Sequence, residues 1–382
     1  MNEGEVRSRL SRLLGPGPEV DPLRERLRTR RKRAAAACAP PAGLVPDLSG
    51  EVLARTTDLD ARSLHGRFAL EEIGFADPRA IAWLARDPSL AAFDLSRALF
   101  LDTETSGLSG GAGTWVFLVG LGWFEAVGVD RPRFRVWQGF LSEPAGESAL
   151  LGEVARRIRS AGAVVSFFGK SFDRHRLEDK MRIHGIEPPF AGRPHLDLYH
   201  PLRRLYRPRA GGGLDDARLK TFERALCGVE REDDLPGAMA PAAWFDFLHR
   251  RPHDLEGVFR HNRDDVLSLV TLAAHLGRTL HESRAGGEEL PGPPAARARE
   301  VAKALVLARE PALSIPWFDR AAGRGDGRLP EDCARLLGRA RRALRKLEKE
   351  KEEGPGRAGA LSESEGDPRS QLQCGTDPRP LL

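Results

Sequence analysis

The 382-residue chain is 41% hydrophobic, enough for one large or two ordinary folded domains, but it has no apolar run of the roughly 18–20 residues that would cross a membrane. Its net charge of +5, from 60 Lys and Arg against 55 Asp and Glu, permits nucleic-acid binding without demanding it. Four widely spaced cysteines exclude a disulfide framework and a zinc ribbon, and no secretory segment opens the sequence, so we expect a cytoplasmic protein with free thiols and no membrane partner.

Composition divides the chain into a central domain and less regular ends. Residues 1–45 are rich in Arg, Ala, Pro and Gly, and we expect a disordered basic arm. Its Arg24 to Arg33 segment is expected to be solvated, which does not exclude the binding of polyanions. Residues 46–94 are expected to be an extension that packs on the core, residues 95–281 the central domain and residues 282–294 a Gly/Pro-rich linker. A helical tail over 295–352 and a disordered segment over 353–382 complete this division.

Strand patterns come first in the central domain and then alternate with helix patterns. Three antiparallel strands are predicted over 97–105, 114–124 and 133–140, the first two joined by a Gly-rich turn at 109–113. They are followed by a helix over 148–160, a strand over 164–168, a helix over 173–184, a short strand over 195–199 and helices near 218–227, 240–250 and 254–280. This order predicts an α/β fold, a mixed sheet of three antiparallel and then parallel strands with helices on both faces.

Two acidic residues close the first predicted strand. Asp102 and Glu104 are spaced i, i+2, so on a strand both side chains emerge from the same face of the sheet. The residues just before them are apolar, so the carboxylates must meet a partner or lie at an open cleft. An Asp-x-Glu pair is common by itself, but carboxylates are the ligands that Mg²⁺ prefers, and the pair is a candidate metal site.

Two further acids are predicted to reach the same cleft. Asp173 follows a short buried strand that breaks at Gly169, which places it at the C-terminal edge of the sheet, where open α/β sheets tend to hold their sites. On a helical wheel of the last central helix, Asp265 falls about 60° from the centre of the buried stripe and Asp264 about 160° away. We therefore expect Asp265 to point inward, beside His261 on the same flank, and Asp264 to point to water.

The four acids Asp102, Glu104, Asp173 and Asp265 would repel one another in one cleft unless cations neutralised them. Two Mg²⁺ or Mn²⁺ ions about 3.5–4 Å apart would do so and would suit phosphodiester hydrolysis, with His261 as a candidate general base or water-orienting group. Structural interpretations stay open for single residues: Asp173 as a helix N-cap, Asp265 as the partner of a nearby Arg or Lys, and His261 as a structural side chain. The order strand, strand end, late helix favours the metal site.

These motifs resemble those of the DnaQ-like, or DEDD, 3′-5′ exonucleases of the ribonuclease-H-like superfamily. Phe100 to Leu108 resembles the first exonuclease motif, Asp173 matches the acid of the second, and His261 to Asp265 matches the third. Closer similarity to the YprB-type branch covers about residues 95–281 and is carried by Leu108–Thr114, Gly169–Asp173, Leu219–Glu223, Asp234–Gly237, His261–Asn262 and Asp265–Leu269. The resemblance implies a metal-dependent nuclease that trims single strands of DNA or RNA from the 3′ end, with Asp102, Glu104, Asp173 and Asp265 as metal ligands.

Two positions depart from the family pattern. His261 lies four residues before Asp265, where proofreading-type members carry Tyr at that spacing or His one residue further away, so its role as base stays open. Phe168 stands where relatives often have Asn, which removes a polar contact. Asp197, at the end of another predicted strand, is either an accessory ligand or the residue that holds a loop.

Other features of the sequence allow alternative functions. Arg203, Arg204, Arg207 and Arg209, beside Tyr206, either contact phosphates and stack a base or form a solvated loop. A non-catalytic nucleic-acid-binding or scaffold protein would keep the same fold, but the four intact acids favour the enzyme. The Gly107–Gly113 loop lacks the Gly-Lys-Ser/Thr ending of a P-loop, and its glycines suit a hairpin turn.

Helix patterns over 295–309, 313–323 and 331–352 form the predicted C-terminal unit. YprB-type relatives can carry tetratricopeptide-like helices here, but Ala321 and Ala322 after Trp317 and Phe318 give only a faint match, so a plain helical hairpin packed on the domain is favoured. This unit is also a candidate surface for a protein partner.

Overall fold

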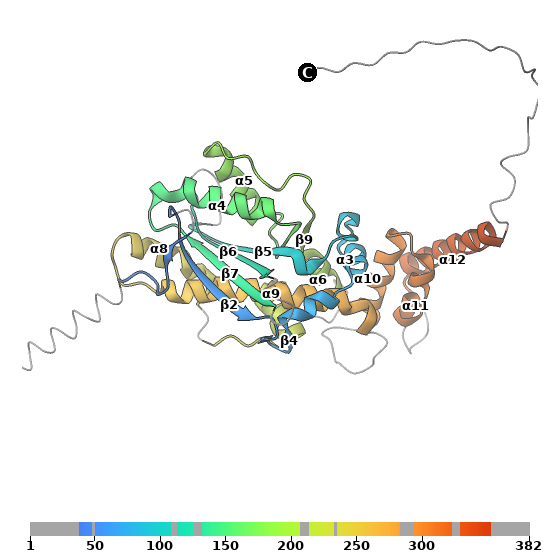
Figure 1. Ribbon diagram of the computed structural model, residues 1–382. Coiled ribbons are helices and arrows are strands. Elements are labelled where there is room, and N and C mark those ends of the chain that lie inside the picture. The colour runs from blue at the N-terminus through green and yellow to red at the C-terminus, as the bar shows by residue number, and fades with distance from the viewer. Residues whose placement is uncertain are drawn as a thin grey trace, which may run out of the picture.

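The central sheet grows from the apolar run that precedes Asp102. In the computed structural model, this run forms β5 (Ala98–Thr105) of a seven-stranded sheet (Figure 1). The structure describes residues 38–47, 50–107, 113–125, 132–206, 214–232, 235–282, 294–322 and 329–352. The strand order is β1-β2-β7-β6-β5-β8-β9. The remaining strands of this sheet are β1 (Val45–Pro46), β2 (Leu53–Asp60), β6 (Val116–Glu125), β7 (Arg133–Phe140), β8 (Ala163–Ser166) and β9 (His195–Asp197).

Strand directions confirm the predicted mixed sheet. β5, β6 and β7 pair antiparallel in chain order, whereas β8 and then β9 add in parallel on the other side of β5. The sequence pattern did not predict β2, which pairs antiparallel with the whole of β7 from Leu53 opposite Phe140 to Asp60 opposite Arg133. Thr and Asp occupy much of β2, and β1 pairs with only its first two residues, so most of β2 lies at the edge of the sheet. A polar strand in that position lacks the apolar alternation by which strands are recognised.

Helices cover both faces of the sheet, as predicted. On one face, α4 (Glu147–Ser160) and α5 (Asp173–Ile183) pack on Leu99 and Leu101 of β5. On the other face lies the long helix α9 (Leu255–Glu282), whose Val266 and Val270 pack around Phe100. Figure 1 shows α9 running along the sheet on the side opposite to α4 and α5. The remaining elements of this part are α3 (Pro78–Ala85), α6 (Tyr199–Tyr206), α7 (Leu219–Phe222), which continues as a π-helical turn over Glu223–Cys227, α8 (Ala240–Leu248) and the hairpin β3 (Leu64–His65) and β4 (Phe68–Ala69).

Two glycines of β6 let α9 approach the sheet closely. Gly120 and Gly122 are two residues apart, so they face the same side of the strand. A Cβ on Gly120 would overlap the side chain of Asn262, and a Cβ on Gly122 would lie 2.6 Å from Cγ1 of Val266. Because glycine in a strand permits such a close approach, α9 lies directly over the end of β5 that carries Asp102.

Three further helices follow the central domain. α10 (Pro294–Leu307) packs on α3 and α6 and adds Val301 and Leu305 to the main core. α11 (Pro311–Ala322) folds back on α10, and its Phe318 forms a small separate cluster with Cys333 of α12 (Glu331–Glu352). Figure 1 shows these helices at the end of the molecule next to α3.

Some predicted features lie outside the described residues. These are the basic segment 24–33, the glycines of the turn at 109–112, residues 283–293 of the expected linker, and the segment 353–382. Within the described ranges, no helix has both the length and the apolar content needed to span a bilayer.

Candidate active site

Asp102 is held by a row of polar residues that crosses the sheet. In the strand register Asp102 lies opposite Gly120, and Gly120 lies opposite Gln138. Asn262 of α9 fills the space above Gly120, and its Nδ2 donates to Oδ2 of Asp102 at 2.7 Å. Gln138 Nε2 donates to Oδ1 of Asn262 at 2.9 Å and to the carbonyl oxygen of Phe259 at 2.7 Å.

The two amides are buried and orient one another. Gln138 is 1% exposed and Asn262 is 0% exposed. An amide nitrogen can only donate, so Gln138 requires the Asn262 oxygen on its side and leaves the Asn262 nitrogen for Asp102. Neither residue was predicted as part of the site. The glycine opposite Asp102 was the available signal, because it marks a position where another group enters the sheet surface.

Three other carboxylates act on Asp102. Burial, and then the charges of Asp265, Glu104 and Asp173, raise the pKa of Asp102 well above its usual value, against the opposing hydrogen bond from Asn262. The charges of the other three predicted acids therefore reach Asp102 at the end of β5. Such a cluster favours a bound cation, because each carboxylate otherwise disfavours the ionised form of its neighbours.

Asp173 reaches the end of β5 from the opposite face of the sheet. It is the first residue of α5, and its Oδ1 accepts a hydrogen bond from the hydroxyl of Thr103, which points away from Asp102. The residue at the N-cap is Phe172, without a side-chain cap, so the N-cap interpretation of Asp173 is wrong. Burial is the largest cause that raises the pKa of Asp173, to about 6, and the charges of Asp197 and Asp265 add to it.

Asp265 pairs with an arginine, as its structural interpretation allowed, but the partner is Arg231, which the sequence did not single out. Its Oδ1 lies 2.6 Å from Nη2 of Arg231, and its Oδ2 lies 3.5 Å from Nε2 of His261. Arg231 also donates two hydrogen bonds of 2.6 Å to Glu223, and its Nη1 lies 3.4 Å from Nδ1 of His261. The inward direction of Asp265 agrees with the helical wheel, since its side chain is only 14% exposed.

Asp264 does not point freely to water, which corrects the wheel prediction for this residue. Its side chain is 18% exposed and pairs with Arg263 at 2.8 Å. The charge of Asp264 also acts on His65 of β3, which packs against α9. The β3–β4 hairpin thus covers a flank of the helix that the isolated wheel leaves open.

Asp197 holds a loop. Its carboxylate accepts backbone N–H groups from Phe168 at 2.8 Å, from Lys170 at 3.1 Å and from Tyr199 at 3.1 Å. These bonds favour the second of its two predicted roles, since they occupy both oxygens. Phe168 has a φ of 59°, in the left-handed region where Asn is favoured over other side chains except Gly.

The residues around Tyr206 are not a base-stacking platform, which corrects that interpretation. Tyr206 is 0% exposed, and its hydroxyl bonds with Nε2 of His275 at 2.7 Å. Arg204 donates to the carbonyl oxygen of Leu84 at 2.6 Å. Arg203 is exposed and lies over the ring of Tyr199. Arg207 and Arg209 lie outside the described residues.

The donor chemistry of the acid cluster fits a hard divalent cation, since its members are carboxylates. In the described ranges, however, no three His, Cys, Asp or Glu side chains converge as they stand on one point that could hold a metal ion. Asp102, Asp173 and Asp265 are instead directed to Asn262, Thr103 and Arg231. Cation binding at this cluster thus requires these side chains to reorient.

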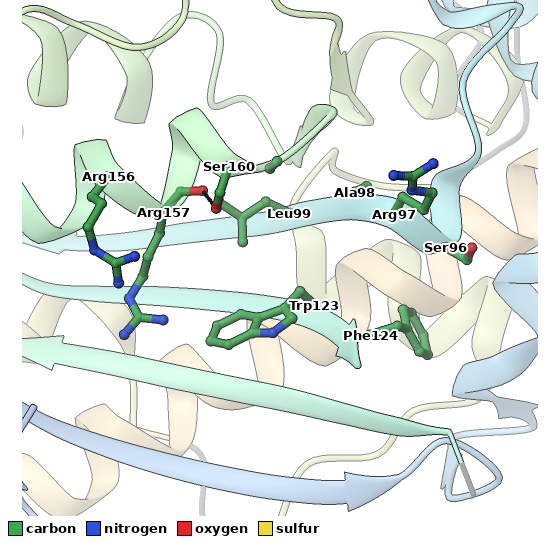
Figure 2. A pocket seen from close by; sticks show the side chains of 10 residues that line it. Ser96, Arg97, Ala98, Leu99, Trp123, Phe124, Arg156, Arg157 and Ser160 are labelled. Carbon is green, nitrogen blue, oxygen red and sulfur yellow. Dashed lines mark hydrogen bonds between the residues drawn. The ribbon is translucent and has the colours of Figure 1, made fainter. Parts of the chain in front are cut away.

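A separate pocket lies at the other end of β5. It has a volume of about 350 Å³ and is lined by Ser96–Leu99, Trp123, Phe124, Arg156, Arg157, Ser160 and Ala161. Figure 2 shows Arg156 and Arg157 projecting from α4 toward Trp123. None of the predicted acids lines this pocket, so the acid cluster stands apart from it.

Comparison with known proteins agrees with the fold and the motifs. Residues 99–277, which include all four acids and His261, match the RNase_H superfamily. The central domain therefore belongs to the ribonuclease-H superfamily, a class in which nuclease activity is common.

Within that class the chain is a YprB-type protein. It is 30% identical over 275 residues to the uncharacterized protein YprB of Bacillus subtilis (strain 168). The alignment covers 70% of this chain and 62% of that relative. The family and fold class predicted from the motifs are thereby confirmed.

Proposed function

We propose that this chain is a metal-dependent nuclease that hydrolyses phosphodiester bonds of DNA or RNA, and that it removes nucleotides from the 3′ end of single strands. One observation carries the proposal: the charges of Glu104, Asp173 and Asp265 converge on the buried carboxylate of Asp102. Membership of the ribonuclease-H superfamily supports nuclease activity in general. The direction of cleavage and the single-stranded substrate rest on the similarity to the 3′-5′ exonucleases, and we expect the activity in the cytoplasm.

Each predicted residue has a role in this proposal. Asp102, Glu104, Asp173 and Asp265 would hold two Mg²⁺ or Mn²⁺ ions, which when bound supply charge stabilisation at the phosphate and the leaving oxygen. Asn262 orients Asp102, and Gln138 orients Asn262. His261, beside Asp265, is placed to orient a water molecule or to accept its proton.

A cleavage assay on the full chain tests the proposal. The substrates are 5′-end-labelled single- and double-stranded DNA and RNA, with Mg²⁺ or Mn²⁺, and circular single-stranded DNA as a substrate without ends. We expect a ladder of products shortened from the 3′ end, an intact circle, and a roughly 10²- to 10³-fold loss of rate in Asp102→Asn, the scale for removing one electrostatic contribution to a transition state.

Glu153→Gln is the matched control, because Glu153 is a buried carboxylate of α4 that pairs with Arg156 and Arg157 away from the acid cluster. This variant should cleave as the wild type does. Binding of nucleic acid without cleavage would instead favour a non-catalytic binding protein. Cleavage that survives in Asp102→Asn would place the activity at another site, and cleavage of the circle would contradict the exonuclease direction but not the nuclease.

A further inference from the structure

Arg231 is a buried cation at the edge of the acid cluster. Its side chain is 3% exposed and lies between Glu223, which is 0% exposed, and Asp265. The hydroxyl of Ser268 also donates to Glu223, and that same hydroxyl lies 2.8 Å from Nε2 of His65. A guanidinium held this firmly by a buried carboxylate cannot leave its position without exposing an unpaired charge.

Two motifs that resemble the YprB-type branch contribute residues near Arg231 and its neighbour His261. Glu223 ends the Leu219–Glu223 motif and receives two hydrogen bonds from Arg231. Gly237 ends the second motif, and a Cβ at its position would lie 3.6 Å from Nε2 of His261. The first segment thus reaches α9 at Ser268 and is linked to Asp265 through Arg231, whereas the second approaches α9 at His261, and neither contributes one of the four acids.

The charges around Asp265 are unevenly shared. Glu223 takes two of the hydrogen bonds of the guanidinium, and Asp265 takes a third contact at 2.6 Å. A divalent cation that used Asp265 would bind the carboxylate whose Oδ1 already contacts Arg231, and it would meet the positive charge of Arg231 at short range. The two cations therefore compete for one carboxylate.

We propose that Arg231 is a fixed counter-charge that holds Asp265 and weakens the binding of divalent cations to the acid cluster. The proposal rests on the proposed function in one respect, that the cluster takes divalent cations. It assigns to Arg231 and Glu223 a regulatory role that is separate from the chemistry of cleavage: they set the metal concentration at which the site becomes loaded.

The double variant Glu223→Gln with Arg231→Met tests the proposal. It removes both members of the Glu223–Arg231 pair and leaves neutral side chains of similar size, so Glu223 is not left as an unpaired buried charge. Asp265 loses its contact with the guanidinium, which is the change under test. Glu147→Gln with Lys180→Met is the matched control, because Glu147 and Lys180 form another buried pair, 2% and 6% exposed, between α4 and α5. Circular dichroism and thermal unfolding establish that each double variant is folded.

The measurement is Mn²⁺ binding by isothermal titration calorimetry to the metal-free full chain. We expect the Glu223/Arg231 double variant to bind Mn²⁺ at least tenfold more tightly than the wild type, and the Glu147/Lys180 control to match the wild type. Asp102→Asn added to the double variant should abolish the gain. Unchanged or weaker binding in the double variant, or a gain that survives Asp102→Asn, would overturn the proposal.

Failure of the proposed function gives a different result. A wild type that binds Mn²⁺ but does not cleave nucleic acid contradicts the nuclease and leaves the counter-charge intact. A wild type that cleaves, with equal Mn²⁺ affinity in wild type and double variant, contradicts the counter-charge alone. Absence of Mn²⁺ binding in both proteins overturns the counter-charge together with the metal requirement.

Discussion

The carboxylates on the two sides of the acid cluster have different kinds of partner. Asp102 and Asp173 are buried at the end of β5 against neutral donors, the amide of Asn262 and the hydroxyl of Thr103, and their pKa values are raised. Asp265, on α9, is bound by the guanidinium of Arg231. One side therefore leaves negative charge that favours an added cation, whereas the other is balanced by the fold itself.

The largest expected effect on stability comes from removing the arginine of the charge-balanced side by a single substitution. Arg231→Met leaves Glu223 charged, buried and without its guanidinium partner, which should lower the free energy of unfolding by about 3–5 kcal/mol. Urea unfolding measures the loss. Adding Glu223→Gln should recover most of it, and a single variant as stable as the wild type would show that Glu223 is not held as an ion.

On the side without a cationic partner, removing a charge should instead stabilise the folded chain. An Asp in the unfolded chain titrates near 3.8, and burial raises the pKa of Asp173 to about 6 in the folded chain. The folded chain then binds this proton more tightly, so the stabilising contribution is full below pH 3.8 and is lost as the pH rises through 6.

Asp173→Asn, which is neutral at every pH, should therefore raise the free energy of unfolding of the metal-free chain by about 3 kcal/mol at neutral pH. The gain should become small near pH 4, and saturating Mn²⁺ should reduce it, because the cation stabilises the charged carboxylate of the wild type. Urea unfolding at the two pH values measures both effects. A gain that does not depend on pH would contradict the buried, charged Asp173.

Loss of the amide beside Asp102 should weaken cation binding. Asn262→Ala removes the hydrogen bond that orients Asp102 and should lower the affinity for Mn²⁺ about tenfold, a usual scale for residues that orient metal ligands. Calorimetric titration measures it. Thr271→Ala is the control, because Thr271 is buried on the same helix and bonds to the carbonyl oxygen of Ser268 rather than to an acid. Equal losses in both variants would assign the effect to general packing.

The smallest expected effect lies in the loop before Asp173. Phe168 adopts a left-handed backbone conformation, which costs a residue other than Gly or Asn roughly 1–2 kcal/mol, and its side chain is 41% exposed. Phe168→Asn should therefore stabilise the chain by about 1 kcal/mol, measured as a rise in thermal midpoint. Phe75→Asn, at a position that is 78% exposed and has no positive φ, should change stability little. No gain in Phe168→Asn would show that its contact with Tyr199 offsets the strain.

Local periodicity was sufficient to predict most strands and helices of the central domain, although not β2, and the direction of individual acidic side chains. An apolar run followed by an i, i+2 pair placed Asp102 and Glu104 on one face, and the helical period directed Asp265 inward, because both arguments depend only on the geometry of a single element. The same reasoning failed at Asp264, since the flank that it occupies is covered by a hairpin from a distant part of the chain. The interpretation of Tyr206 was wrong for a similar reason, because its hydrogen-bond partner His275 is 69 residues away in the sequence.

The partners of the acids could not be predicted in this way. Gln138 and Asn262 meet only because β7, β6 and β5 align in register beneath α9. Arg231 comes from an irregular segment with no period, and its contact with Asp265 joins residues 34 positions apart. Buried polar contacts of this kind depend on tertiary packing, which a single sequence shows only through indirect marks such as a glycine inside a strand.

The close approach of α9 to Gly120 and Gly122 couples the positions of three site residues. This one helix carries Asn262, His261 and Asp265, so the distance between the helix and the sheet determines the positions of all three. A methyl group at residue 120 would act as a wedge and shift all three at once. A substitution at one of these three residues changes one side chain of the site, whereas a change in the distance between α9 and the sheet moves all three together.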